Sequence, residues 1–246
     1  MSIPDRPSPP PKPISEVWRP ELVRLPELTP ARRRLRGFMC LLMRSILRLA
    51  MRVQVRGLEN FPLRGPALVV TNHLGDGDTP LILSMLPADL EAMAKIELYD
   101  FPVLGRLMEA YGVIWLHRGQ PDRRALRAAL QAFEAGRMVI IAPEGRYSLT
   151  GGMEAGTGGA AFLARKGGVP VVPVALTGTD NASIYHHLVR LRRAPVTLTI
   201  GAPFRFEGRD PGAETQRRED TRRIMESLAR LLPPEYRGVY AGTGGP

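Results

Sequence analysis

Short runs of apolar residues alternate with segments of helical pattern along most of this chain, and this alternation constrains the fold more than any other feature. Apolar runs of this length, bounded by turn residues, are typical of buried strands, and strands separated by helices are typical of an α/β layered fold. The predicted strands are 67–71, 112–116, 138–142, 169–176 and 196–200, and the predicted helices are 79–86, 122–135, 158–166 and 214–232. With 246 residues the chain is long enough for one sizeable core, so we expect a single α/β domain.

One of the predicted strands contains two prolines. Pro170 and Pro173 lie inside 169–176, and proline has no N–H to donate to a neighbouring strand. We therefore expect this strand at an edge of the sheet or in an irregular position. The strand at 196–200 alternates apolar and polar residues, which predicts that only one of its faces is buried.

Positive charge is concentrated near the N-terminus. The chain has 34 basic and 24 acidic residues, a formal net charge of +10. Residues 31–56 contain no acidic residue, and the eight arginines of this segment are Arg32, Arg33, Arg34, Arg36, Arg44, Arg48, Arg52 and Arg56. Because the rest of the chain is nearly neutral, the charge indicates one local surface for a polyanion.

The segment 31–56 also has apolar residues between its arginines and predicts a basic amphipathic helix. Arg44, Arg48 and Arg52 are four residues apart, so they would share one helical face. Arginine interrupts the apolar residues too often for a helix that spans a bilayer, whereas such a helix can lie in the membrane interface. We expect it to dock on an anionic membrane; a surface helix with solvated arginines is the alternative. No nucleic-acid-binding motif is present, so we expect no nucleic-acid partner.

The ends of the chain differ in composition from the predicted domain. Residues 1–30 contain nine prolines, which predicts an extended or disordered tail. We expect the α/β domain to span 57–235 and a glycine-rich tail to span 236–246. Cys40 is the only cysteine, so no disulfide can form within the chain, and we find no pattern of a cleaved signal peptide.

A histidine and a carboxylate follow the first predicted strand. His73 and Asp78 are five positions apart in a loop whose two glycines permit a tight reversal. A carboxylate on one imidazole nitrogen leaves the other nitrogen as a general base, which suits deprotonation of a substrate hydroxyl. A structural loop histidine capped by an aspartate at the helix N-terminus, or a metal site that includes Asp76 and Asp78, is the alternative. The loop has too few oxygen ligands to favour a metal.

Two further loops carry an arginine after a predicted strand. Glu144, Gly145 and Arg146 follow strand 138–142, and Arg118 follows strand 112–116. A guanidinium with free backbone N–H groups can bind an anionic oxygen such as that of a phosphate. An ordinary turn and an exposed loop arginine are the alternatives. The glycines match neither a Walker A loop nor a dinucleotide-binding fingerprint, so nucleotide binding is not supported.

Taken together and in this order, the segments resemble the glycerophospholipid acyltransferase family, which includes the 1-acylglycerol-3-phosphate acyltransferases. The N-H-x4-D motif of this family matches Asn72, His73 and Asp78, and its G-x5-R motif matches 112–118. Its P-E-G-T-R-S motif is similar to 143–148, and its V-P-V motif is similar to 172–174. The order and spacing of the four motifs are more specific than any one of them.

The resemblance implies an α/β domain with a mixed central sheet flanked by helices. It implies that His73 is the general base, oriented by Asp78, and that the acceptor is the hydroxyl of a lysophospholipid such as 1-acylglycerol-3-phosphate. The donor would be acyl-CoA or acyl carrier protein, with no cofactor and no metal. Arg118 and the loop 144–146 would bind the phosphate of the acceptor. The N-terminal region would hold the protein on the cytoplasmic face of the cell membrane as a peripheral protein.

The sequence departs from the family pattern at three positions. Arg146 replaces the usual threonine, Tyr147 replaces the usual arginine, and Gly75 stands where a serine is common. A protein of the same fold that binds lipid surfaces without catalysis is the alternative function. The intact His73 and Asp78 favour an enzyme.

Overall fold

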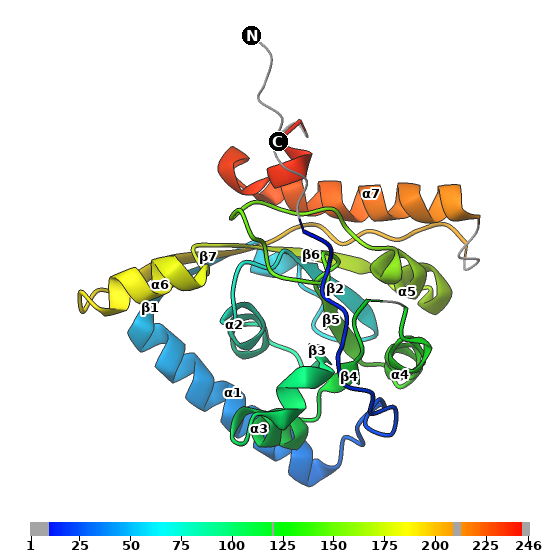
Figure 1. Ribbon diagram of the computed structural model, residues 1–246, viewed down its shortest axis with the longest axis horizontal. Coiled ribbons are helices and arrows are strands. Elements are labelled where there is room, and N and C mark those ends of the chain that lie inside the picture. Colours follow the sequence, from blue (N-terminus) through cyan, green and yellow to red (C-terminus); the bar gives the residue numbers. More distant parts are fainter. Residues whose placement is uncertain (1–9, 120, 209–212, 243–246) are drawn as a thin grey trace.

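The computed structural model describes residues 10–119, 121–208 and 213–242, and this part of the chain is built around one seven-stranded sheet (Figure 1). The strands are β1 Met51–Arg56, β2 Ala67–Thr71, β3 Leu90–Lys95, β4 Ile114–Leu116, β5 Met138–Ile141, β6 Val171–Thr177 and β7 Ala194–Ile200. Their order across the sheet is β1-β7-β6-β2-β5-β3-β4. Strands β6 and β7 pair antiparallel and all the other pairs are parallel. The predicted α/β class with a mixed sheet is confirmed.

Helices cover both faces of the sheet. Figure 1 shows α1, α2 and α3 at its lower left, α7 above it and α5 at its right. Each face has its own apolar core, with Leu81 of α2 buried in one and Leu228 of α7 buried in the other. The α-helices are α1 Pro30–Ala50, α2 Asp78–Met85, α3 Leu104–Tyr111, α4 Arg123–Glu134, α5 Gly159–Gly167, α6 Asn181–Leu188 and α7 Glu214–Leu231. Short 3-10 helices are η1 Leu58–Asn60, η2 Ile96–Asp100, η3 Pro234–Tyr236 and η4 Gly238–Tyr240.

The five apolar runs all form strands. β2 is buried along its whole length because it lies between β5 and β6. β7 shows the predicted alternation, with one face buried and the other partly exposed. β3 was not predicted because its sequence, LEAMAK, consists of residues that favour helices. Its Glu91 is buried, and this is possible because Arg36 of α1 forms an ion pair with it.

The expectation of an edge or irregular position for the proline-containing strand is wrong. β6 lies inside the sheet, between β7 and β2. The sheet tolerates Pro173 because this residue lies at the end of the antiparallel ladder, whose register begins at Val174. There Pro173 uses only its carbonyl, which accepts a hydrogen bond from the Gly201 N–H at 2.9 Å. Pro170 likewise acts as an acceptor, for the Leu68 N–H at 2.9 Å.

The predicted helix 31–56 is only partly correct. Helix α1 ends at Ala50, and Met51–Arg56 forms β1, an edge strand that pairs with β7. The sequence MRVQVR alternates apolar and basic residues, a strand pattern that the arginine spacing obscures. Arg52 is therefore on a strand and does not share a helical face with Arg44 and Arg48.

Only some of the arginines of α1 lie on its exposed side, among them Arg34 and Arg48. Arg36 is fully buried and forms a bidentate ion pair with Glu91, and Arg44 Nε donates to the Ser84 carbonyl at 2.5 Å. The exposed side of α1 also carries six large apolar side chains, those of Leu35, Phe38, Leu41, Leu42, Ile46 and Leu49. We call this set the apolar face of α1. Within the described residues no helix is both long and apolar enough to cross a membrane.

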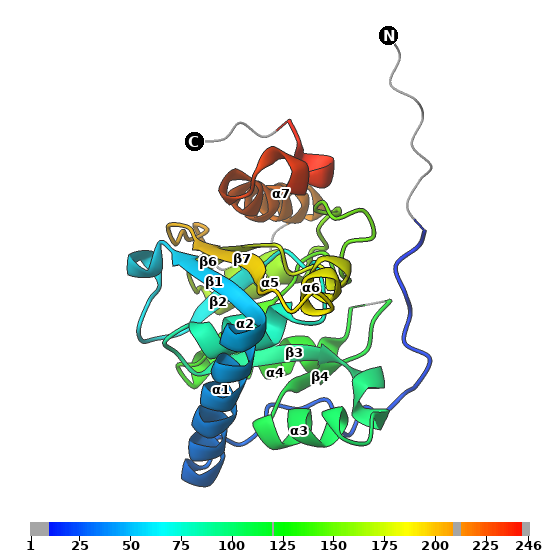
Figure 2. The same cartoon turned by 90° about the vertical axis from the view of Figure 1, so that its left-hand side faces the viewer.

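The predicted N-terminal tail lies against the body of the protein wherever it is described. Residues 10–19 run in extended conformation past the ends of β4 and β5 (Figure 2). Ser15 exchanges hydrogen bonds with Arg118 there. The centroids of the Trp18 and His117 rings are 4.4 Å apart. Much of the predicted C-terminal tail is packed as well, because the Val239 N–H donates to the Met153 carbonyl. Residues 1–9 and 243–246 of the two predicted tails lie outside the described residues.

Candidate active site

The predicted pair of His73 and Asp78 forms at the carboxyl end of β2. His73 lies in the loop after this strand, and Asp78 is the first residue of α2. His73 Nδ1 and Asp78 Oδ2 are 2.7 Å apart. The carboxylate is buried, whereas 26% of the histidine side chain is exposed. Since Nδ1 faces Asp78, Nε2 on the opposite side of the ring is the nitrogen that a substrate can reach.

Asp78 also organises the backbone of the loop. Its Oδ2 accepts hydrogen bonds from the N–H groups of Leu74 at 2.6 Å and Gly75 at 2.9 Å, in addition to the imidazole. Its Oδ1 is buried and has no hydrogen-bond partner in the described part of the chain. The carboxylate therefore fixes the ring and the loop through a single oxygen.

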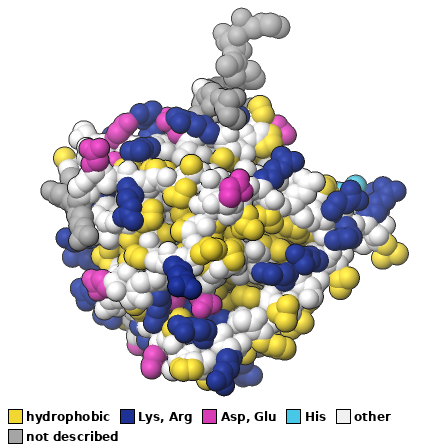
Figure 3. All heavy atoms as spheres, turned by 180° about the vertical axis from the view of Figure 1, so that it is seen from behind, with side chains coloured by type: hydrophobic (Ala, Val, Ile, Leu, Met, Phe, Trp, Pro, Cys, Tyr) yellow, Lys and Arg dark blue, Asp and Glu magenta, His cyan; other side chains and the backbone are white. Residues whose placement is uncertain are grey.

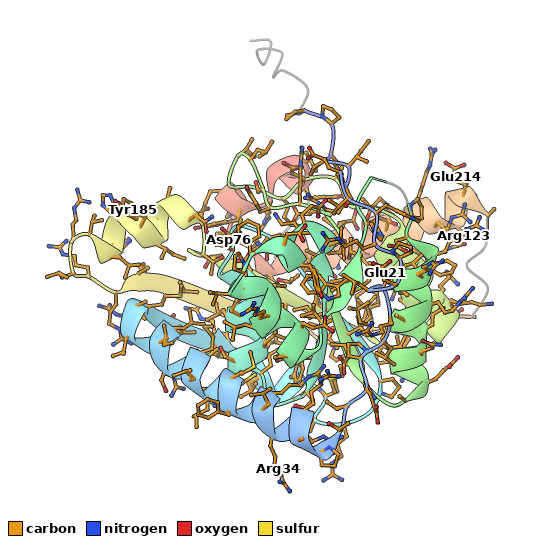
Figure 4. All side chains as sticks on the ribbon, turned by 60° about the horizontal axis from the view of Figure 1, so that its bottom comes forward. Glu21, Arg34, Asp76, Arg123, Tyr185 and Glu214 are labelled. Carbon is orange, nitrogen blue, oxygen red and sulfur yellow. The ribbon has the colours of Figure 1, made fainter. Side chains whose placement is uncertain are left out.

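Asp76 has a different role from Asp78. It is exposed, and its Oδ2 accepts a hydrogen bond from Asn181 Nδ2 at 3.0 Å, which connects the loop to α6 (Figure 4). Gly75 is required beside it, because a Cβ there would lie 2.5 Å from the Thr179 carbonyl oxygen. Within the described residues no three His, Cys, Asp or Glu side chains are grouped so that they could hold a metal ion.

Glu144 holds the histidine loop against the loop that follows β5. Its Oε1 accepts from the His73 N–H at 3.0 Å, and its Oε2 accepts from the Glu154 N–H at 2.6 Å. The side chain is 0% exposed, and this burial raises the pKa of Glu144 to about 7. Since each carboxylate oxygen already accepts from a backbone N–H, Glu144 positions the two loops. Gly145 belongs to a turn of the loop after β5, where its N–H donates to the Ala142 carbonyl and its φ of +73° lies in the left-handed region.

The two arginines predicted to bind phosphate each have an acidic partner. Arg146 Nε lies 2.6 Å from Glu154 Oε2, and Arg118 Nη2 lies 3.6 Å from Glu97 Oε1. Arg118 Nε is buried without a hydrogen-bond partner among the described residues, so one donor of this guanidinium is not satisfied by the protein. No sequence pattern pointed to Glu97 or Glu154, since acidic residues are common at surfaces.

The N-terminal segment reaches the same arginine loop. Arg146 Nη1 donates to the carbonyls of Pro10 at 2.9 Å and Pro11 at 3.3 Å, and Lys12 Nζ donates to the Ala155 carbonyl at 2.8 Å. An anion that binds Arg146 through Nη1 has to displace these carbonyls.

A second pair with the same spacing shows why spacing does not identify the site. His117 Nδ1 lies 2.8 Å from Asp122 Oδ2, five positions along. This histidine is buried, however, and its Nε2 accepts from the Arg19 N–H at 3.0 Å. Both of its nitrogens are occupied, so this pair is structural. Tyr147, by contrast, is exposed and lies edge-on to the His73 ring at 6.0 Å between centroids.

The model of a known family, described as Acyltransferase, matches residues 52–177, about half of the chain. The chain belongs to this acyltransferase family. The matched segment runs from β1 to the end of β6 and contains His73, Asp78, Arg118 and the loop 144–146. Helices α1, α6 and α7 lie outside it.

Individual acyltransferases support the same assignment. The 1-acyl-sn-glycerol-3-phosphate acyltransferase of Pseudomonas aeruginosa is 31% identical over 193 residues, which cover 76% of this chain and 72% of that protein. The lyso-ornithine lipid O-acyltransferase of the same organism is 29% identical and covers 79% of this chain and 80% of that protein. A chloroplastic 1-acyl-sn-glycerol-3-phosphate acyltransferase of Brassica napus is 34% identical over 52% of this chain, and the match spans only 38% of that enzyme.

A solved acyltransferase structure confirms the fold. The crystal structure of the 1-acyl-sn-glycerophosphate (LPA) acyltransferase PlsC from Thermotoga maritima matches with a TM-score of 0.61 and 29% identity. The match covers 79% of this chain and 78% of that one.

Proposed function

We propose that this protein is an O-acyltransferase that transfers an acyl group from a thioester to the hydroxyl of a lysophospholipid such as 1-acylglycerol-3-phosphate. Phospholipid biosynthesis or remodelling is the process in which it would act. The observation that carries the proposal is the pair of His73 and Asp78, with 2.7 Å between Nδ1 and Oδ2 and the imidazole partly open to solvent. Family membership and the names of the relatives support the reaction type.

In the proposed reaction His73 Nε2 accepts the proton of the acceptor hydroxyl as its oxygen attacks the thioester carbonyl. The new carbon–oxygen bond forms in a tetrahedral intermediate, which collapses with cleavage of the carbon–sulfur bond. The thiol leaves with the proton that the imidazolium returns. Asp78 holds Nδ1 as the donor and stabilises the imidazolium. No covalent acyl-enzyme is required, and the donor is acyl-CoA or acyl carrier protein.

Recognition of the acceptor is assigned to Arg118 and the loop 144–146. The unsatisfied Nε of Arg118 supports this role, because a phosphate oxygen would supply its missing acceptor. Glu97 and Glu154 hold the two guanidinium groups in place, and each leaves part of a guanidinium available.

The protein is proposed to act as a peripheral protein on the cytoplasmic face of the cell membrane. The apolar face of α1 supports this, since six exposed apolar side chains beside Arg34 and Arg48 suit insertion between anionic head groups. Arg48 and Arg52 remain exposed and can contact lipid phosphates. Arg44, whose Nε is bonded to Ser84, is the least available of the three predicted arginines.

The experiment that tests the proposal is an acylation assay of the purified protein with radiolabelled acyl-CoA, or acyl carrier protein, and a panel of lysolipids. The panel should include lysophosphatidate and lyso-ornithine lipid, the acceptors that the relatives' names indicate. His73→Ala should lower turnover by about 10² to 10⁴-fold. If no acceptor is acylated, the enzymatic proposal is wrong and non-catalytic binding of lipid surfaces takes its place. If acylation occurs and His73→Ala keeps wild-type turnover, the proposed role of His73 as the general base is wrong.

A further inference from the structure

The end of α6 and the turn that follows it form a second exposed apolar surface. We call residues 185–193, with the sequence YHHLVRLRR, the α6 tip. Four of its apolar side chains are exposed, those of Tyr185, Leu188, Val189 and Leu191. Figure 4 shows Tyr185 on the side of α6 that points away from the body. The tip projects from the molecule beyond β1 and β7 (Figure 1).

Leu191 is the most unusual residue of the tip. Its side chain is 98% exposed, and its φ of +53° lies in the left-handed region, where glycine is favoured. The turn is held by hydrogen bonds from the Leu191 N–H to the Leu188 carbonyl and from the Arg192 N–H to the His187 carbonyl. A leucine at this position strains the backbone and gains no burial within the chain. Folding therefore does not explain it, whereas contact with an apolar partner does.

The charge of the tip selects the kind of partner. Arg190, Arg192 and Arg193 are all exposed, and no acidic residue occurs between Asn181 and Ile200. Figure 3 shows this projecting end from behind, with basic and apolar side chains side by side. A surface that combines the two kinds of side chain suits an anionic bilayer, which offers phosphates at its surface and acyl chains beneath.

The tip is joined at both ends to elements that the proposed function uses. Arg193 donates through Nε and Nη2 to the Met51 carbonyl, at 3.2 and 2.9 Å, where α1 ends and β1 begins. At its other end α6 begins at Asn181, whose amide contacts Asp76 in the loop of His73. Since an eight-residue helix is about 12 Å long, the tip lies close to the catalytic loop.

We propose that the α6 tip is a second membrane-contacting surface, which together with the apolar face of α1 seats the protein on an anionic bilayer with the His73 loop near the lipid interface. This proposal rests on the proposed lipid acyltransferase function and adds a docking element outside the segment that matches the family model. An acidic soluble protein such as acyl carrier protein would complement the charge of the arginines but would not account for the exposed apolar side chains. The four exposed apolar side chains and the continuity with α1 favour the bilayer.

Sedimentation with vesicles tests the proposal. The vesicles contain phosphatidylcholine and phosphatidylglycerol in equal parts, and phosphatidylcholine alone serves for comparison. Leu191→Gly removes the exposed side chain and relieves the backbone strain, so its melting temperature should equal or exceed that of the wild type. Its partition onto the mixed vesicles should fall by about tenfold. Arg190→Gln and Arg192→Gln should each lower it by about fivefold, and only on vesicles with anionic lipid.

Val239→Ala is the matched control, because Val239 is an exposed apolar residue on η4, at the C-terminal end near α7 and on the other face of the sheet. It should bind vesicles like the wild type. In the tip variants, turnover on an acceptor embedded in vesicles should fall relative to turnover on a water-soluble short-chain acceptor. Wild-type partition of Leu191→Gly and of the arginine variants would overturn the proposal. A loss confined to reactions with acyl carrier protein would also overturn it and assign the tip to that protein.

The outcomes separate this proposal from the function on which it rests. If the tip variants lose vesicle binding but the wild type acylates no lysolipid, the docking surface stands and the enzymatic proposal fails. If the wild type acylates lysolipids, the tip variants bind vesicles like the wild type and Phe38→Glu abolishes binding, α1 alone carries the docking and the tip proposal fails.

Discussion

Replacement of Asp78 by asparagine separates the two roles that this residue has in the structure. The carboxylate holds the loop through hydrogen bonds to the N–H groups of Leu74 and Gly75, and it carries the negative charge beside His73. An asparagine oxygen can accept the same three hydrogen bonds, and its amide nitrogen then takes the place of Oδ1, which has no hydrogen-bond partner among the described residues. We therefore expect Asp78→Asn to fold and to lose mainly the charge.

The magnitude follows from the geometry. Two unit charges roughly 4 Å apart at an effective dielectric constant of about 20 interact by about 4 kcal/mol. The imidazolium that forms in the transition state loses this stabilisation in Asp78→Asn, so turnover should fall by about 10³-fold. Asp78→Ala should lose a similar factor and also unfold more readily, because its buried N–H groups lose their acceptor at about 1–3 kcal/mol each.

The assay is turnover at saturating acceptor, measured together with urea unfolding for wild type, Asp78→Asn, Asp78→Ala and His73→Ala. The expected pattern is that both Asp78 variants lose activity and that only Asp78→Ala loses much stability. If Asp78→Asn stays within threefold of the wild-type turnover while His73→Ala is inactive, the charge of Asp78 is not used and the electrostatic reasoning is refuted.

Three further predictions follow from other parts of the structure. Burial raises the pKa of Glu144 to about 7, above the ordinary carboxyl value. The contribution of Glu144 to the free energy of unfolding should therefore decline by up to about 3 kcal/mol as the pH rises from about 4.5 to 7. Urea unfolding of Glu144→Gln, measured across the same pH range, should lack this decline. Arg36→Met should lower the free energy of unfolding in urea by about 3–5 kcal/mol, because it leaves the buried Glu91 without its bidentate partner. A second substitution, Glu91→Leu, should restore part of the lost stability. Further destabilisation by the second substitution would contradict this reasoning. Removal of residues 1–11 takes away the two carbonyls that accept hydrogen bonds from Arg146. The acceptor KM should therefore fall by about fivefold. An unchanged KM would show that this segment does not compete with the acceptor.

Much of the fold could be predicted from the sequence because the relevant signals are local. The buried run of β2 and the alternation of β7 are visible in five to seven consecutive residues. The prediction failed where a local pattern had two interpretations. The arginines at intervals of four suggested one continuous helix over 31–56, but the last six residues of that segment, Met51–Arg56, pair with β7, more than 140 positions away in sequence.

In the candidate site, too, local signals could be recognised in the sequence, whereas contacts between distant residues could not. His73 and Asp78 could be found because their spacing within one loop and the family motifs both point to them. The same spacing at His117 is structural, and only the tertiary structure distinguishes the two, because Arg19 and Trp18 cover the second histidine from almost a hundred positions away. Glu97 was missed because its partner, Arg118, comes from a different segment of the chain. Glu154 lies in the same loop as its partner, Arg146, but no local pattern shows that the two side chains face each other.

The sequence by itself determined the α/β class, the pair of His73 and Asp78 and the concentration of arginines near the N-terminus, because each depends on residues that are close along the chain. Tertiary structure decided which face of α1 is exposed, which arginines are already paired, and where the N-terminal segment and the α6 tip lie. The physical reason is burial: Glu91 lies in the core and cannot remain unpaired there, so it draws Arg36 inward and turns the apolar face of α1 outward. No spacing within α1 carries that information.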